Sequence, residues 1–103
     1  MDNKNDPLVL GILKLELSTR RFYIKGKSIF LRNKEFCLME YFMKNIGRVL
    51  SRTQILEEVW DHNIICPTNT VDVHVSTLRQ KLENLKCRDF IKTIHCVGYL
   101  FEA

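Results

Sequence analysis

The 103-residue chain has only four cysteines, and none of them forms a C-x-x-C pair. Structural zinc sites normally carry paired ligands at short spacing, so this absence argues against a metal site, although His62 and Cys66 lie four residues apart. Small buried or half-buried thiols are the expected state of Cys37, Cys66, Cys87 and Cys96. We therefore expect no metal ligands in this chain.

The sequence also lacks a secretory hydrophobic region and any apolar run long enough to span a membrane. We expect the chain to work in the reducing cytoplasm, without a membrane partner. No nucleophile–base pair, phosphate-cradling glycine loop or acid pair at motif spacing is visible. The expectation is a protein that is not an enzyme and needs no cofactor.

What the chain does have is enough apolar sequence for one domain. Its hydrophobic content of 46% and its length suit a core that forms without disulfides or metal. The net charge of +4 and the pI near 9.0 favour a polyanionic partner, although an excess of this size is also common in proteins that bind nothing acidic. Polar residues 1–7 are expected to be a disordered linker remnant, followed by a domain over residues 8–103.

Both ends of this domain have the pattern of β-strands. Leu13, Leu15 and Leu17 alternate with Lys14 and Glu16, and a "KGK" turn separates two further β-rich runs. These features predict an N-terminal antiparallel sheet. Near the C-terminus, "FIKTIH" and "GYLFEA" are two more β-rich runs, which a short turn would join into a hairpin.

Three helices are predicted between the strands, over residues 34–45, 51–60 and 69–83. The second begins with Ser51 and Gln54 at the spacing of a capping box. The third has one buried stripe at helical spacing, made of Val71, Val75, Leu78 and Leu82. This order of elements predicts an α+β fold, a winged helix-turn-helix with an N-terminal antiparallel sheet, three helices and a C-terminal β-hairpin wing.

The opposite face of the third helix is unusual because its side chains are mostly short, uncharged and able to form hydrogen bonds. A face that only meets water would usually carry more charge. This second face is therefore a candidate contact surface, and it comprises Asn69, Val73, Ser76, Thr77 and Gln80.

Four segments give this pattern a specific resemblance: "LRNKEFCLMEYF", "GRVLSRTQILEEVW", "NTVDVHVSTLRQKLE" and "IKTIHCVGYLFEA". They resemble the DNA-binding effector domain of OmpR/PhoB-type response regulators, from about Leu8 to the C-terminus. The resemblance implies sequence-specific binding of double-stranded DNA in a two-component system that regulates transcription. The third helix would enter the major groove, and the hairpin wing would reach the neighbouring minor groove.

The resemblance also implies roles for single residues. The base contacts would come from the uncharged face, namely Asn69, Val73, Ser76, Thr77 and Gln80. Ser76 and Thr77 stand where many relatives carry arginine, so the reading of bases shifts toward Asn69, Val73, Thr77 and Gln80. The expected phosphate contacts are Trp60, Thr70, His74, Arg79 and Thr93. For His74, a place at the edge of the core is the alternative.

The wing departs from the family pattern "R-G-x-G-Y". His95 stands in place of the minor-groove arginine, and Cys96 replaces the first glycine. A histidine can enter a narrow minor groove, although its charge is partial near neutral pH. Gly98 and Tyr99 match the pattern, and we expect the glycine to supply backbone freedom and the ring to pack the wing onto the domain.

The resemblance finally implies partners. These are double-stranded DNA with tandem direct repeats, a receiver domain in the full-length protein, and RNA polymerase. The polymerase contact would use the loop between the second and third helices, at Asn63, Ile64 and Ile65. The alternative is a winged-helix protein-interaction module that binds protein through the third helix or through the loop at 61–68.

Overall fold

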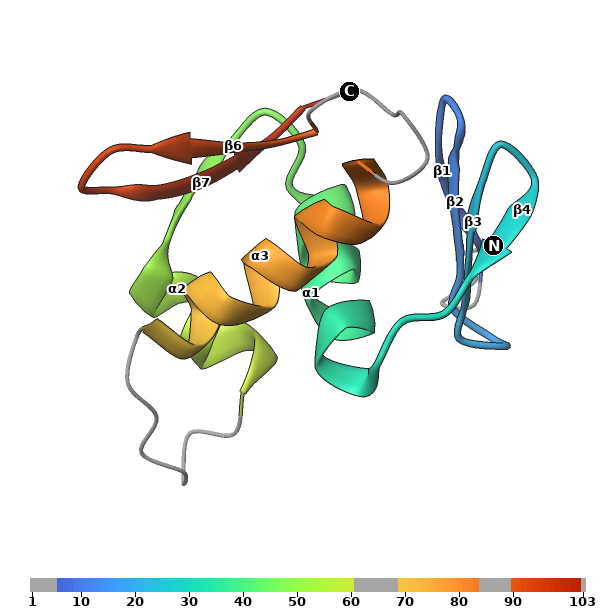
Figure 1. Ribbon diagram of the computed structural model, residues 1–103, viewed down its shortest axis with the longest axis horizontal. Coiled ribbons are helices and arrows are strands. Elements are labelled where there is room, and N and C mark those ends of the chain that lie inside the picture. The colour runs from blue at the N-terminus through green and yellow to red at the C-terminus, as the bar shows by residue number, and fades with distance from the viewer. Residues whose placement is uncertain (1–5, 61–68, 84–89, 103) are drawn as a thin grey trace.

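The computed structural model of the chain describes residues 6–60, 69–83 and 90–102. The order of its elements confirms the predicted fold class (Figure 1). Four strands come first, three helices follow with a short strand between the first two, and a hairpin closes the chain. The elements are β1 (Leu8–Leu10), β2 (Leu13–Glu16), β3 (Arg21–Ile24), β4 (Lys27–Ile29), α1 (Asn33–Lys44), β5 (Val49–Ser51), α2 (Arg52–Val59), α3 (Asn69–Glu83), β6 (Ile91–Ile94) and β7 (Gly98–Phe101).

The N-terminal strands form the predicted antiparallel sheet, in the order β1-β2-β3-β4. In the central pair, Leu13 lies opposite Ile24 and Leu15 lies opposite Phe22. All four side chains are buried, whereas Lys14 between them is exposed on the other face. The sheet stands on one side of α1 (Figure 1), so its apolar face closes that side of the core.

Helix α1 connects this sheet to the rest of the core. The ring of Phe42 on α1 stacks on Phe101 of β7 with 5.8 Å between centroids, and Phe101 in turn stacks on Phe90 at 5.9 Å. All three rings are buried. Full burial of one such side chain stabilises a fold by about 1.5–3 kcal/mol, so this aromatic stack is a substantial part of the core.

Helices α2 and α3 confirm two specific sequence predictions. Ser51 Oγ accepts the Gln54 backbone N–H at 3.0 Å, and Gln54 Oε1 accepts the Ser51 N–H at 2.9 Å, which completes the capping box. On α3, the predicted apolar stripe is buried along its whole length, at Val71, Val75, Leu78 and Leu82. The stripe fixes the rotation of α3 and therefore determines which side chains remain outside.

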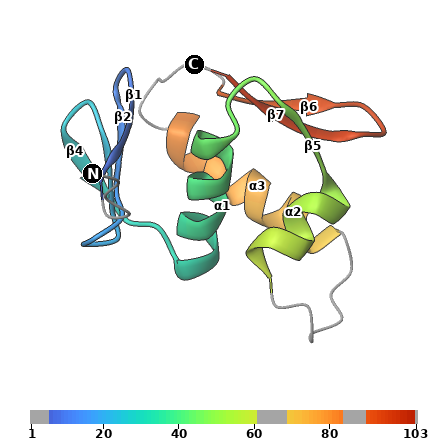
Figure 2. The ribbon, with the colours of Figure 1, turned by 180° about the vertical axis from the view of Figure 1, so that it is seen from behind.

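The hairpin belongs to a three-stranded sheet that the sequence did not predict. Strand β5 pairs with β7, and the order is β5-β7-β6 (Figure 2). The predicted reason for Gly98 was wrong, because its conformation is not one that needs glycine. A Cβ atom at Gly98 would lie 2.0 Å from the carbonyl oxygen of Leu50. Strand β5 can therefore approach this closely only because residue 98 has no side chain.

Some sequence expectations fall outside the described residues. These are most of the linker at 1–7, the polymerase loop with Asn63, Ile64 and Ile65, and the thiols of Cys66 and Cys87. Cys37 is half-buried as expected, but the expectation for Cys96 was wrong, because it is exposed in the turn of the wing. Within the described ranges, no helix combines the length and the apolar character needed to cross a membrane.

Candidate nucleic-acid interface

The five residues predicted to contact bases lie together on the outer face of α3. Asn69, Ser76 and Gln80 are exposed, and Val73 exposes 61% of its surface. Thr77 is half-buried, and its hydroxyl donates to the backbone oxygen of Val73 at 3.1 Å. The threonine oxygen can still accept a hydrogen bond, whereas its proton is already used. The face is therefore a neutral surface with an apolar centre.

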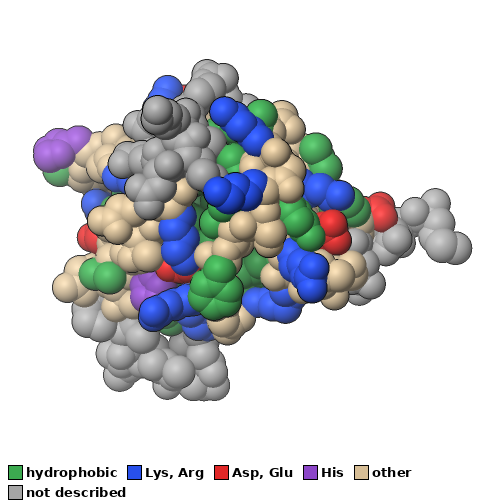
Figure 3. Space-filling view, turned by 45° about the vertical axis from the view of Figure 1, so that its right-hand side comes forward, with side chains coloured by type: hydrophobic (Ala, Val, Ile, Leu, Met, Phe, Trp, Pro, Cys, Tyr) green, Lys and Arg blue, Asp and Glu red, His purple; other side chains and the backbone are tan. Residues whose placement is uncertain are grey.

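The molecular surface around α3 is basic. Figure 3 views the molecule obliquely from the side on which α3 lies, and Lys and Arg side chains spread over this surface more widely than Asp and Glu. A neutral helix face within basic surroundings suits a polyanion that presents uncharged groups between its charges. Double-stranded DNA has this arrangement.

Trp60 and His74 meet where α2 ends beside α3. Their rings pack edge to face, with centroids 4.9 Å apart and an interplanar angle of 80°. Nδ1 of His74 lies 2.8 Å from the backbone oxygen of Thr70. Because a carbonyl oxygen only accepts, Nδ1 carries the proton, and a neutral ring then has no N–H left for a phosphate. The half-buried His74 thus lies at the edge of the core, and a phosphate contact through Nε2 requires the protonated ring.

Arg79 joins α3 to the wing. Its Nε and Nη2 atoms donate to the backbone oxygen of Ile91 at 3.0 and 2.8 Å, and Nη2 also donates to Thr93 Oγ1 at 2.7 Å. The predicted phosphate ligand therefore also anchors β6. Thr93 is exposed, and because its oxygen accepts from Arg79, its proton remains able to reach another acceptor.

A second connection between α3 and the wing passes through Asp72. Its Oδ1 accepts from Arg52 Nε at 2.8 Å and from the Tyr99 hydroxyl. The guanidinium of Arg52 lies over the Tyr99 ring, 5.3 Å from its centroid, and that of Arg79 lies 5.5 Å from it. Tyr99 is only 5% exposed, which confirms that it packs the wing onto the domain. We refer to Arg52, Asp72 and Tyr99 as the wing clamp.

The wing clamp alters the ionisation of its members. Burial opposes ionisation of Asp72, but hydrogen bonds from Tyr99 and Arg52 outweigh it and hold the pKa of that carboxyl below its usual value. Burial and the bond to Asp72 raise the pKa of Tyr99. The hydrogen bond to Asp72 likewise raises the pKa of Arg52. The clamp therefore stays charged and bonded near neutral pH.

The wing clamp could not be predicted from the sequence, for a physical reason. An acid in the first turn of a helix is already explained by the helix dipole, so Asp72 carries no separate signal. Arg52 and Tyr99 lie 20 and 27 positions away, and only the packed fold brings them to one oxygen atom. The one available hint was the opposite charge of Arg52 and Asp72 near the starts of two successive helices.

The turn of the wing carries His95, Cys96 and Val97, all exposed. Cys96 has a φ of +62°, the left-handed conformation that glycine adopts without strain. The Val97 N–H donates to the backbone oxygen of Ile94 at 3.0 Å and closes the turn. The turn therefore forms without the first glycine of the family pattern, at the cost of a strained cysteine, and His95 is presented beside it.

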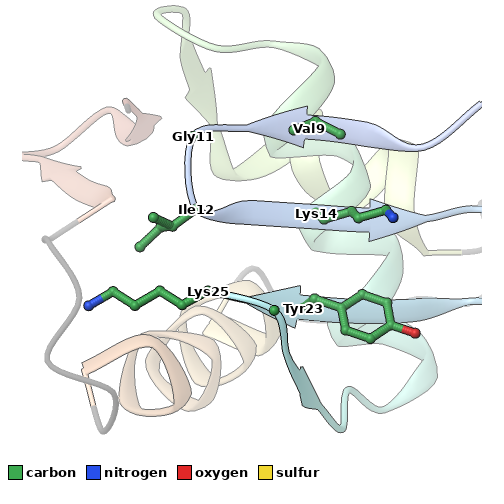
Figure 4. A pocket seen from close by; sticks show the side chains of 7 residues that line it. Val9, Gly11, Ile12, Lys14, Tyr23 and Lys25 are labelled. Atoms are coloured by element: carbon green, nitrogen blue, oxygen red, sulfur yellow. The ribbon is translucent and has the colours of Figure 1, made fainter.

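A separate hollow of about 410 Å³ lies on the outer face of the N-terminal sheet (Figure 4). Val9, Lys14 and Tyr23 project from neighbouring strands there. The side chains that line this hollow include no carboxylate and no nucleophile–base pair. It therefore offers no catalytic set, and α3 remains the stronger candidate for function.

Comparison with known proteins agrees with this geometry. The family described as "Transcriptional regulatory protein, C terminal" matches residues 26–101. The phosphate regulon transcriptional regulatory protein PhoB of Rhizobium meliloti (strain 1021) is 39% identical over 93 residues, which are 90% of this chain and 41% of that protein. The chain thus spans about two fifths of the length of this relative.

Two solved structures are also similar. The response regulator DrrB of Thermotoga maritima, an OmpR/PhoB homologue, is 31% identical with a TM-score of 0.82, over 94% of this chain and 44% of that one. The RstA DNA-binding domain of Klebsiella pneumoniae, solved in complex with the RstA box, is 26% identical with a TM-score of 0.78, over 94% and 97%. The chain belongs to the family of C-terminal domains of transcriptional regulatory proteins, and within it to the OmpR/PhoB type of response regulator.

Proposed function

We propose that this chain binds double-stranded DNA sequence-specifically and regulates transcription as the effector domain of a two-component response regulator. Helix α3 lies in the major groove, and the β6–β7 wing lies at the minor groove. The observation that carries this proposal is the neutral outer face of α3, which stands beside a wing held by Arg79 and the wing clamp. A rigidly connected helix and wing can reach two grooves at once.

Base recognition comes from the outer face of α3. The exposed Val73 meets thymine methyl groups, since apolar contact with that methyl is available only in the major groove. The amides of Asn69 and Gln80 offer a donor and an acceptor each, which suits adenine. The hydroxyls of Ser76 and Thr77 add contacts of low selectivity. Four of these five side chains are exposed in the free domain.

Phosphate contacts come from the edges of the same surface. Along one edge, phosphates contact Trp60, Thr70 and protonated His74. Along the edge beside the wing, they contact Arg79 and Thr93. In this arrangement Arg79 binds a phosphate with the part of its guanidinium that does not hold Ile91 and Thr93. Its replacement therefore loosens the wing as well as removing a charge. His95 approaches the minor groove from the turn of the wing.

The wider setting is part of the proposal. The family is defined by transcriptional regulation, and we assign no catalytic activity to this chain. In the full-length cytoplasmic protein, a receiver domain would control binding to tandem direct repeats. The loop at 61–68, with Asn63, Ile64 and Ile65, would meet RNA polymerase. The greater length of the PhoB relative supports a second domain.

A gel-shift experiment on nonspecific duplex at low salt tests the proposal. DNA binding that neutralises phosphates must weaken steeply as salt rises, because it releases counterions. A winged-helix module that binds only protein should show no salt-sensitive retardation. Val73→Ala then separates base reading from backbone binding, because its loss of about 1–3 kcal/mol should appear on a selected site and vanish on scrambled DNA.

The tandem arrangement has its own test. Two half-sites about one helical turn apart should bind two domains more tightly than one, since both then lie on the same side of the duplex. Moving one half-site by about half a turn should abolish this gain. Unchanged affinity after the shift would contradict the tandem arrangement and leave DNA binding itself intact.

A further inference from the structure

We propose that Phe30 and Arg32, in the segment between β4 and α1, form a further contact with the DNA backbone on the flank of α3 that lies away from the wing. This inference rests on the proposed function. It assigns a DNA contact to a segment outside α3, the wing and the loop between α2 and α3.

The two flanks of α3 follow from helix geometry. With about 100° between successive residues, Asp72 and Arg79 lie on one flank, while His74 and Lys81 lie on the opposite one. Asp72 and Arg79 bind the wing. A helix in the major groove has a phosphate backbone on each side. The flank of His74 and Lys81 therefore needs its own backbone contacts.

The structure shows a hollow of about 620 Å³ on this flank. Phe30 and Arg32 form one wall, and α3 forms the other with Val73, His74, Thr77 and Lys81. Val73 and Thr77 belong to the proposed base-reading face. The hollow thus continues from the base-reading face toward the segment before α1, without an intervening element among its lining residues.

The charge exposed in the hollow is positive. Its one acidic lining residue, Glu35, is only 2% exposed and pairs with Lys81, which also donates to the backbone oxygen of Phe30 at 3.0 Å. Arg32 is exposed, and its guanidinium has no hydrogen-bonding or ion-pair partner among the residues that the structure describes. A phosphate would supply the missing partner and match the donor geometry of a guanidinium.

Phe30 gives the hollow an apolar wall. It exposes 76% of its surface, and the Lys81 ammonium lies 5.5 Å from its ring centroid. The C–H groups of a deoxyribose beside the bound phosphate would cover part of this ring. We therefore assign the phosphate to Arg32 and the neighbouring sugar to Phe30.

The test measures DNA affinity of the whole chain by fluorescence anisotropy between about 50 and about 200 mM salt. Arg32→Gln should make the salt dependence of the affinity shallower by about one ion. The ratio of wild-type to variant affinity should therefore shrink about 3.5-fold as the salt concentration rises across this range. Lys27→Gln is the matched control, because it removes the same charge from an exposed position at the far end of β4. Its salt dependence should equal that of wild type. Phe30→Ala should lower affinity about fivefold at every salt concentration without changing the slope.

Thermal unfolding of each variant keeps the result interpretable. Arg32→Gln should unfold at the wild-type temperature, because the arginine guanidinium forms no hydrogen bond or ion pair with the residues that the structure describes. A wild-type slope for Arg32→Gln, or equal changes for Arg32→Gln and Lys27→Gln, would overturn the inference while leaving DNA binding in place. Absence of salt-sensitive binding by the wild type would instead overturn the proposed function, and this inference with it.

Discussion

Replacing Asp72 with asparagine should weaken the attachment of the wing to α3. The substitution keeps the size of the side chain but removes the negative charge that Arg52 and Tyr99 share. The hydroxyl of the buried Tyr99 then has only a neutral amide as its partner. The wing should lose part of its fixed orientation, because Tyr99 lies on β7 and its ring packs against the guanidinium groups of Arg52 and Arg79.

The size of the effect follows from exposure. The Arg52 and Asp72 side chains are 29% and 38% exposed, so solvent screens their ion pair, and its loss costs about 0.5 kcal/mol. Exchanging a charge-assisted hydrogen bond from Tyr99 for a neutral one costs about 1 kcal/mol. Since each kcal/mol moves the melting temperature of a domain of this size by roughly 4–8 °C, we expect a fall of roughly 6–12 °C at pH 7.

The effect should depend on pH with a defined sign. The folded state lowers the pKa of Asp72, so its stabilising contribution is complete above the unfolded value of about 3.9 and is lost as the pH falls through the folded value. The difference in stability between wild type and Asp72→Asn should therefore be full at pH 7 and should shrink below about pH 4.

Thermal unfolding, followed by circular dichroism at pH 7 and at about pH 3, measures this difference in stability. Glu57→Gln on α2 is the matched control, because it removes one exposed carboxylate without touching the clamp. Tyr99→Phe combined with Asp72→Asn should cost less than the two single changes added together, since one change removes and the other weakens the same hydrogen bond. A stabilising role of the wing clamp is refuted if Asp72→Asn and Glu57→Gln have the same melting temperature at pH 7, or if the stability that Asp72→Asn loses at pH 7 is lost undiminished at pH 3.

Three further outcomes are expected. Gly98→Ala should destabilise the domain by about 3 kcal/mol in urea unfolding, because its Cβ would collide with the Leu50 carbonyl; an unchanged midpoint would contradict the close approach. Cys96→Gly should stabilise it by about 0.5–1 kcal/mol in the same assay by relieving the positive φ, and a loss of stability would show that the turn is not strained. His95→Arg should tighten DNA binding, because arginine is always charged and a narrow minor groove attracts it; unchanged or weaker binding would exclude a minor-groove contact at this position.

Long periodic patterns were the part of the fold that the sequence could predict. The stripe of Val71, Val75, Leu78 and Leu82 determines the rotation of α3, and the neutral outer face follows from that rotation. The capping box at Ser51 similarly located the start of α2. Such features depend on neighbours a few residues apart, which the sequence displays directly.

Features that depend on distant partners were not predictable. Strand β5 has three residues, too few for a periodic signal, and it is defined by its pairing with β7 near the other end of the chain. That pairing also explains Gly98. The wing clamp and the bonds from Arg79 to β6 likewise join residues that only the packed fold brings together. The roles of the base- and phosphate-contacting residues remain predictions.

Selection of bound sequences from a random duplex pool tests the central claim most directly, because it asks whether α3 reads DNA. We expect an enriched motif, present as two copies in the same orientation about one helical turn apart. The selected duplex should bind about 10³-fold or more tightly than a scrambled one, and Val73→Ala should reduce that ratio. A pool without enrichment, or equal affinity for selected and scrambled duplexes, would contradict sequence-specific recognition by this domain.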